Sequence, residues 1–228
     1  MVIMSSDNRI KISASGPNDR LHLYSATIVQ EFKEIDDSRR DDIKKIAEYI
    51  IGQITEKRGA SLLFVCTHNS RRSQLAQVWI KIATVFYGVN DIASFSGGTE
   101  VSGVNIRVIR SLERAGVTIN CPDPGLTNPV YNVMGDEFNG AMELFSKLYD
   151  DPANPDTGFC AVMVCSDADE ACPVVAGADM RTAIPYSDPG YSDDSPSETE
   201  IYDATCRTIA REMFFTVSLI KKSKTNNS

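Results

Sequence analysis

The chain has 228 residues, of which 42% are hydrophobic, and this is enough for one α/β domain with a sizeable core. Its formal net charge of −8 argues against general nucleic-acid binding, and no apolar run approaches the length of a membrane span. The N-terminus lacks the apolar region of a signal peptide, so we expect a cytoplasmic protein with reduced cysteines and no membrane partner. The chain has six cysteines but only two histidines and no Cys-x-x-Cys pair, so we expect thiols or redox-active cysteines rather than the alternative of a zinc site.

Residues 1–60 are expected to form an N-terminal extension. Residues 1–20 have little periodicity and are predicted to be a loose segment, and a short helix is predicted from His22 to Phe32. Residues 41–57 have the spacing of an amphipathic helix, and Asp36 to Ser38 supply residues that can cap it. We expect these helices to brace the domain. The alternative is a surface for oligomerisation or for a partner protein.

The stretch from Ser61 to Ser73 contains the clearest candidate for a catalytic motif. Four apolar residues lead directly into Cys66, which is typical of a buried parallel strand, and helical spacing covers about residues 73–87. The pattern therefore predicts a strand, a tight loop and a helix. Such a loop presents unpaired backbone N–H groups at the positive end of a helix dipole, and this suits an oxyanion and a nucleophilic thiolate.

The expected roles in this loop follow from side-chain chemistry. Arg72 has a fork of donors that matches a tetrahedral oxyanion held over the Cys66 sulfur, and the Ser73 hydroxyl can donate a hydrogen bond to the thiolate. An anion site in an acidic protein must be cationic locally, and Arg71 supplies a second positive charge. The predicted oxyanion-binding residues are the five between the cysteine and Arg72, namely Thr67, His68, Asn69, Ser70 and Arg71.

The rest of the chain alternates between strand and helix patterns. We predict a short strand over 93–96, a helix over 105–115 closed by Gly116, a buried strand over 159–165, a last strand over 181–185 and a helix over 199–222. Residues 120–158 are expected to be an insertion that contains a helix from Phe138 to Tyr149. Cys121 is predicted to be an idle surface thiol, and Cys160 and Cys206 to be packing residues.

Two further groups are predicted at the carboxyl edge of the sheet, where ligands bind in open α/β folds. Cys165 and Cys172 are separated by six residues in a loop and can bridge if the loop folds over, although the pair alone is also consistent with one buried and one idle thiol. Asp188 follows the last strand and is a candidate proton donor, although Asp-Pro is also common in turns. The acidic residues after it, Asp193, Asp194 and Glu198, are expected to be solvated charges and residues of a helix N-terminus.

The loop resembles the signature of the low-molecular-weight protein tyrosine phosphatases and of the thioredoxin-coupled arsenate reductases that share their fold. In that superfamily a nucleophilic Cys is followed by five residues, Arg, and Ser or Thr, which match Cys66, Arg72 and Ser73, and Asn69 matches a loop asparagine. His68 stands where the family usually has Gly, and Arg71 where it usually has a second Cys. We expect His68 to tolerate a left-handed backbone.

The resemblance extends to residues outside the loop. The segment from Ser96 to Asn105 is similar to a Ser-Ala-Gly-Thr segment of the superfamily and implies that Ser96 supports the loop without doing chemistry. Asp188-Pro189 matches the general-acid dipeptide, and Tyr191 resembles a phosphatase tyrosine that lines the substrate cleft.

The stretch from Cys165 to Pro173 resembles the redox loop of the thioredoxin-coupled arsenate reductases, a pair that the phosphatases lack. The resemblance implies that Cys66 attacks arsenate, that Cys165 then attacks Cys66 and releases arsenite, and that Cys172 resolves the resulting disulfide. A thioredoxin-type reductant would reset the pair, and no bound cofactor is expected.

We therefore predict a doubly wound, four-stranded parallel α/β domain of the low-molecular-weight phosphatase type over residues 61–228, preceded by the helical extension. The predicted function is arsenate reduction to arsenite. The alternatives are a phosphatase that hydrolyses phosphomonoesters through a phosphocysteine, with Asp188 as acid and then base, and a non-catalytic protein that senses oxyanions.

Overall fold

A parallel sheet of four strands forms the centre of the computed structural model, which describes residues 18–135, 142–172 and 174–226. The strands are β1 (Ala60–Cys66), β2 (Ile92–Gly98), β6 (Phe159–Met163) and β7 (Ala178–Ala183), in the order β2-β1-β6-β7. The two inner strands, β1 and β6, are the continuous apolar runs of the sequence, because an inner strand of a parallel sheet is buried on both faces. The predicted four-stranded parallel sheet is confirmed.

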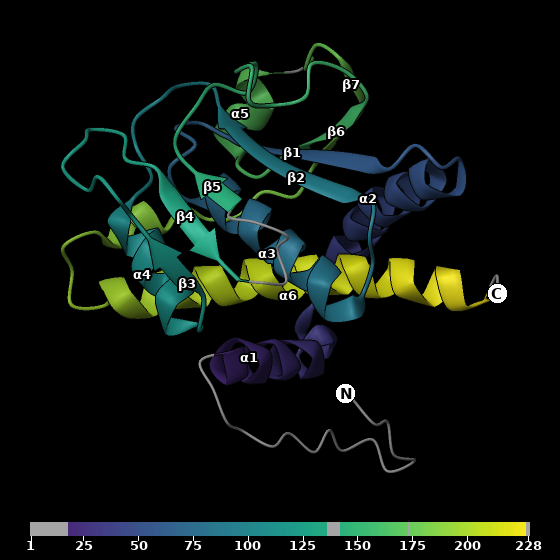
Figure 1. Ribbon diagram of the computed structural model, residues 1–228, viewed down its shortest axis with the longest axis horizontal. Coiled ribbons are helices and arrows are strands. Elements are labelled where there is room, and N and C mark those ends of the chain that lie inside the picture. Colours follow the sequence, from purple (N-terminus) through teal and green to yellow (C-terminus); the bar gives the residue numbers. More distant parts are fainter. Residues whose placement is uncertain (1–17, 136–141, 173, 227–228) are drawn as a thin grey trace.

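The order of the strands reverses beside β1, and this reversal places the site. The chain leaves β1 through α3 (Arg72–Tyr87) toward β2, and leaves β6 through α5 (Ser166–Ala171) toward β7. Right-handed crossovers in opposite directions put these helices on opposite sides of the sheet, as Figure 1 shows. Val65 is paired with Met163, so Cys66 at the end of β1 and Cys165 just after β6 lie at the same edge of the sheet, where ligands bind in such folds.

Helices α6 (Glu198–Asn226) and α4 (Ile106–Arg114) complete the layer that contains α3. In Figure 1 the long helix α6 runs along one side of the sheet, with α3 between them. The fully buried Trp79 of α3 contacts Phe214 of α6, with their ring centres 6.3 Å apart. Asn105, the first residue of the predicted helix, is the cap of α4, because its side chain accepts a hydrogen bond from the Arg107 N–H. The helix closes at Gly116 as predicted, and this glycine has a φ of 101°.

Of the N-terminal elements, the first helix packs on the outer side of this layer, and the second packs beside α6 against β7 and β1. These elements are α1 (Asn18–Gln30), the 3₁₀ turn η1 (Phe32–Glu34) and α2 (Asp37–Thr55), which begins four residues before the predicted start. Tyr24 of α1 stacks on Trp79 with ring centres 5.3 Å apart, and Glu31 forms an ion pair with Arg207 of α6. Asp36 is the cap residue of α2, but its side chain makes no capping hydrogen bond.

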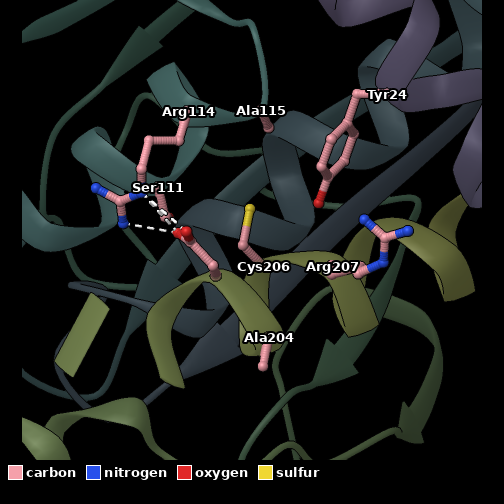
Figure 2. Close-up of a pocket in the computed structure, with 8 residues that line it drawn as sticks. Tyr24, Ser111, Arg114, Ala115, Ala204, Cys206 and Arg207 are labelled. Carbon is pink, nitrogen blue, oxygen red and sulfur yellow. Dashed lines mark hydrogen bonds and ion pairs between the residues drawn. The ribbon is translucent and has the colours of Figure 1, made fainter. Parts of the chain in front are cut away.

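A pocket of about 230 Å³ lies between α1, α4 and α6 (Figure 2). Arg114 of α4 binds both carboxylate oxygens of Asp203 of α6, and the Cys206 sulfur accepts a hydrogen bond from the Trp79 indole at 3.2 Å. These groups join α4, α3 and α6 to one another, and the buried position of Cys206 confirms that it is a packing residue.

The insertion forms a second sheet rather than the predicted helix. Its strands are β3 (Thr118–Asn120), β4 (Tyr131–Met134) and β5 (Met142–Leu144), paired antiparallel in that order. The predicted helix from Phe138 to Tyr149 is therefore wrong from Met142 onward, and residues 138–141 lie outside the described residues. Strand pairing buries Val133 and Leu144 completely, and this tertiary contact overrides the local helical spacing.

Within the described residues, no helix is both long enough and apolar enough to span a membrane. In the same part of the chain, no three His, Cys, Asp or Glu side chains come together as a metal site.

Candidate active site

The loop after β1 is fixed to the segment that follows β2. The N–H groups of Thr99 and Glu100 donate to the carbonyls of Cys66 and Thr67, at 3.2 and 2.8 Å, and the Asn105 N–H donates to the Ser70 carbonyl at 3.0 Å. The Ser70 hydroxyl also donates to the Gly103 carbonyl at 2.6 Å. The loop is therefore held in one shape by backbone groups, whatever its side chains bind.

Gly98, the last residue of β2, allows this close approach. A Cβ atom at this position would lie 2.6 Å from the carbonyl oxygens of Thr67 and Glu100 and 2.7 Å from the nitrogen of Asn69, and all three are backbone atoms. Only glycine fits here without moving the loop.

Asn69 orients the hydroxyl that faces the Cys66 sulfur. Its Oδ1 accepts the Lys147 backbone N–H at 2.9 Å, so its Nδ2 is the group that donates to the Ser73 Oγ at 2.8 Å. The Ser73 Oγ lies 3.1 Å from the Sγ of Cys66. Because the Ser73 oxygen accepts from Asn69, its own proton is available for the sulfur, and a hydrogen bond of this kind stabilises a thiolate.

The left-handed residue in the loop is Asn69, with a φ of 46°, and not His68. Asparagine tolerates this conformation better than most residues. The His68 ring is half exposed, and its Nε2 lies 3.2 Å from a carboxylate oxygen of Glu100.

Arg72 lies at the N-terminus of α3 with 8% of its side chain exposed. Its Nη2 donates to the Asp188 Oδ2 at 2.7 Å and its Nη1 to the Tyr186 carbonyl at 3.1 Å. The buried Nε has no hydrogen-bond partner among the described residues. Buried guanidinium donors are normally satisfied, and an oxyanion over the loop is a ligand that suits this one.

Asp188 begins the 3₁₀ turn η3 (Pro189–Ser192) and is held by it. Its Oδ1 accepts the Gly190 N–H at 2.9 Å, while its Oδ2 receives Arg72. The carboxyl group thus borders the guanidinium that is the predicted oxyanion ligand, and this is the position that a proton donor to a leaving oxygen requires.

The Arg71 side chain contacts residues that lie outside the nucleophile loop. Its Nε donates to the Tyr202 hydroxyl at 2.8 Å and its Nη2 to the Asp193 Oδ2 at 2.9 Å. Asp193 was expected to be a solvated charge, and that expectation is wrong. Its side chain is 24% exposed and is bound by Arg71, by Tyr202 and, at 3.7 Å, by Arg107.

The charge state of this cluster follows from its contacts. Burial acts to raise the pKa of Asp193, but the Tyr202 hydrogen bond and the charges of Arg71 and Arg107 outweigh it, so the pKa is lowered. Burial, together with the hydrogen bond to Asp193, raises the pKa of Tyr202 to about 12. Asp193 and Tyr202 therefore remain a carboxylate and a neutral phenol around Arg71 at neutral pH.

Cys165 is fully buried at the end of β6 and lies beside the loop. Its Sγ is 3.6 Å from the Thr67 Oγ1 and accepts a hydrogen bond from the Ala168 N–H at 3.4 Å. The residues between Cys165 and Cys172 form the six-residue helix α5, not the expected loop. Cys172 is half-buried at the end of that helix, and all six cysteines are free thiols.

The C-terminal end of α5 is held by one arginine. Arg181 of β7 donates to the carbonyls of Cys172, at 2.9 Å, and Asp169, at 2.7 Å, and also pairs with the Asp169 carboxylate. A helix of six residues is not stable alone, so this contact helps to hold the end of α5 that carries Cys172.

The remaining predicted residues are placed as follows. Ser96 is buried in β2 opposite Phe64, and its hydroxyl has no partner among the described residues, so its supporting role stays a prediction. Tyr191 is 73% exposed in η3 and lines a pocket with Tyr186 and Ile201 on the α6 side. Cys160 is fully buried, and burial raises the pKa of its thiol to about 12, which confirms a packing role.

Sequence reasoning missed Tyr202, Lys147 and Gln74 around the site. Lys147 is 5% exposed, and burial lowers the pKa of its amine to about 8. The Gln74 amide donates to the carbonyls of Asn69 and Phe145, at 2.9 and 3.0 Å, and so joins the loop to the insertion. A glutamine on a buried helix face was the one sequence signal that could have indicated such a contact.

Comparison with known proteins gives relatives for part of the chain. Arsenate reductase 2 of Staphylococcus epidermidis is 27% identical over 129 residues, which are 57% of this chain and 78% of that protein. The arsenate reductase of Brevibacillus brevis is 27% identical over 129 residues, which are 57% of this chain and 76% of that protein. An arsenate reductase of Staphylococcus aureus is 29% identical over 113 residues, which are 50% of this chain and 66% of that protein. No protein-family model matches the chain.

Among solved structures, a low-molecular-weight phosphotyrosine phosphatase of Vibrio cholerae covers 72% of this chain and 99% of its own at a TM-score of 0.49 and 15% identity. The corresponding phosphatase of T. tengcongensis covers 70% of this chain and 99% of its own, with a TM-score of 0.47 and 16% identity. The chain is similar in sequence to these arsenate reductases, in agreement with the superfamily that its Cys66–Ser73 motif resembles.

Proposed function

We propose that this protein is an arsenate reductase that uses Cys66 as its nucleophile. Arg72 and the backbone N–H groups of the loop bind the oxyanion, and the Ser73 hydroxyl stabilises the thiolate. The Cys66 thiolate attacks the arsenic atom and forms a sulfur–arsenic(V) bond. One arsenate oxygen leaves as water after it takes the Asp188 proton.

The second half of the reaction uses the downstream cysteines. The Cys165 thiolate attacks the Cys66 sulfur, and the sulfur–arsenic bond breaks with its electron pair on arsenic, which leaves as arsenite. Cys172 then attacks Cys165, forms the Cys165–Cys172 disulfide and releases the Cys66 thiolate. A thioredoxin-type dithiol reduces that disulfide, so each arsenate consumes two electrons from the external reductant.

The observation that carries this proposal is the 3.6 Å contact between the Cys165 Sγ and the Thr67 Oγ1. Thr67 is the residue after Cys66, so a thiol that the sequence separates from the nucleophile by almost a hundred residues lies beside the nucleophile loop. Phosphomonoester hydrolysis through Cys66, Arg72 and Asp188 needs no second thiol. The free thiols of all six cysteines suit the reducing cytoplasm, which we propose as the compartment.

The test is thioredoxin-coupled NADPH consumption on addition of arsenate, with wild type beside Cys172→Ser and with Cys121→Ser as the control thiol. Wild type and Cys121→Ser should turn over repeatedly. Cys172→Ser should stop after one equivalent of arsenite with Cys66 and Cys165 joined, as peptide mass spectrometry would show. Sustained turnover by Cys172→Ser, or no arsenite from wild type, contradicts the proposal.

Phosphomonoester hydrolysis is the second candidate, because Cys66, Arg72 and Asp188 form a complete set for it without the cysteine pair. The 2.7 Å contact between Arg72 and Asp188 favours phosphomonoester hydrolysis as much as it favours arsenate reduction. Hydrolysis of an aryl phosphate that Cys66→Ser abolishes, and that a Cys165→Ser variant retains, would identify this activity.

A further inference from the structure

Arg71 occupies the loop position where the resembled family usually has a second cysteine, and its contacts give it a role of its own. We infer that Arg71 is a positioning residue that holds the acid loop, residues 186–194, over the nucleophile loop, so that Asp188 lies where it can protonate the leaving oxygen. This inference rests on the proposed use of Asp188 as the acid and adds the residue that places it.

The guanidinium of Arg71 is one corner of a closed hydrogen-bond triangle. It donates to the Tyr202 hydroxyl at 2.8 Å and to the Asp193 Oδ2 at 2.9 Å, and the Tyr202 hydroxyl donates to the Asp193 Oδ1 at 2.7 Å. Tyr202 is fully buried in α6, so it is a rigid point of attachment. The triangle therefore joins the N-terminus of α3, the acid loop and the C-terminal helix.

The same guanidinium also lies against the peptide that orients the acid. A Cβ atom on Gly190 would lie 2.9 Å from the guanidinium carbon of Arg71, so only glycine allows this approach. The Gly190 N–H donates to the Asp188 Oδ1, and the Arg71 Nε is 3.9 Å from that oxygen. A displacement of Arg71 would thus release the backbone turn that holds the Asp188 carboxyl.

The contacts of Arg71 argue against direct oxyanion binding. Its charge is matched by the Asp193 carboxylate, and its Nε and Nη2 already donate to Tyr202 and Asp193. Arg72 differs, because its buried Nε has no partner among the described residues. Asp193 is also approached by Arg107 of α4, whose Nε pairs with Glu198 at 2.7 Å, so the acid loop is anchored from three helices.

The first test separates positioning from oxyanion binding, with the full chain and inorganic phosphate as the oxyanion probe. We expect Arg71→Gln to lower kcat for arsenate reduction by about ten- to a hundredfold, because a misplacement of about 1 Å in a reacting group has this cost. The phosphate concentration that half-protects Cys66 from iodoacetamide should stay within about twofold of wild type. A tenfold rise in that concentration would make Arg71 an oxyanion ligand and overturn the inference.

The second test asks whether Arg71 acts through Asp188. It compares kcat in Arg71→Gln, in Asp188→Asn and in the double variant that carries both changes. The double variant should be no slower than Asp188→Asn alone, because an acid that is absent cannot be misplaced. Arg71→Lys, which keeps one charged donor, should recover part of kcat. If the loss of kcat in the double variant were the product of the two single losses, the inference would be contradicted.

The third test does not depend on the proposed activity. Backbone hydrogen exchange over residues 186–194 should be faster in Arg71→Gln and in Tyr202→Phe than in wild type. Arg114→Gln, which breaks the Arg114–Asp203 ion pair elsewhere on α6, is the matched control and should leave that exchange unchanged. An absence of turnover in wild type would refute the proposed function alone, whereas unchanged exchange in Arg71→Gln would refute the positioning role.

Discussion

The Thr67 Oγ1 lies 3.6 Å from the Cys165 Sγ, although 98 positions separate the two residues in the chain. The contact exists because β1 and β6 are neighbouring parallel strands that end at the same edge of the sheet. It brings one member of the downstream cysteine pair to the loop that carries the nucleophile. The other member, Cys172, is held at the far end of α5 by Arg181.

Replacement of Ser73 by alanine should slow the reaction of Cys66. The variant loses the hydroxyl at 3.1 Å from the sulfur and leaves the Asn69 amide without its acceptor. A hydrogen bond to a charged group contributes about 1.5–3 kcal/mol, so the rate of Cys66 alkylation near pH 7 should fall about tenfold or more. Ser73→Thr keeps the hydroxyl and is the matched control. An unchanged rate in Ser73→Ala would show that the hydroxyl does not act on the sulfur.

Gly98→Ala should destabilise the protein and distort the loop. Its Cβ would meet three backbone atoms at 2.6–2.7 Å, and such overpacking costs about 1–3 kcal/mol in the free energy of unfolding. Gly52→Ala is the control, because nothing lies within 4 Å of its added Cβ in the exposed end of α2, and it should stabilise by about 0.5–1 kcal/mol. Urea denaturation measures both changes, and equal stabilities of the two variants would contradict the prediction.

The buried Lys147 should make stability depend on pH in the alkaline range. Burial lowers the pKa of its amine from the ordinary 10.5 to about 8. Between these values the unfolded chain binds more protons than the folded one, so stability rises with pH across this window and is reduced below pH 8. Lys147→Met should therefore be more stable than wild type at pH 7, by about 1–3 kcal/mol.

The difference between Lys147→Met and wild type should shrink as pH rises from 8 to 10.5, as measured by denaturant unfolding at each pH. Lys44→Met, at an exposed lysine that pairs with Asp41, should show no such trend. A constant difference across that range would mean that the Lys147 amine does not titrate there.

Arg181→Gln should loosen α5 and expose Cys172. The variant loses the donors to the Cys172 and Asp169 carbonyls, and a six-residue helix has little stability of its own. Hydrogen exchange over residues 166–172 should be faster, and the rate of Cys172 alkylation should rise severalfold. Cys121 alkylation provides the internal control and should not change. Unchanged exchange in α5 would show that other contacts hold the helix.

The sequence alone determined the strand, loop and helix around Cys66, because those elements depend on residues that are close in the chain. The apolar run of β1, the spacing of Cys66, Arg72 and Ser73, and the apolar face of α3 each act within a few residues. The same is true of Asn105 and Gly116 at the two ends of α4, and all were located correctly. The Asp188 turn was located for the same reason.

Only the tertiary structure decided the features that depend on distant partners. Met142 to Leu144 became a strand because β4 lies beside it. Asp193 became a partly buried ion-pair partner because Arg71 and Tyr202 meet it from α3 and α6. These partners cannot be recognised from the residues next to Met142 or Asp193 in the sequence. An acidic residue in a loop before a helix has the sequence pattern of a solvated charge. Burial and pairing with distant groups, rather than residue type, set the contacts of Arg71, Lys147 and Cys165.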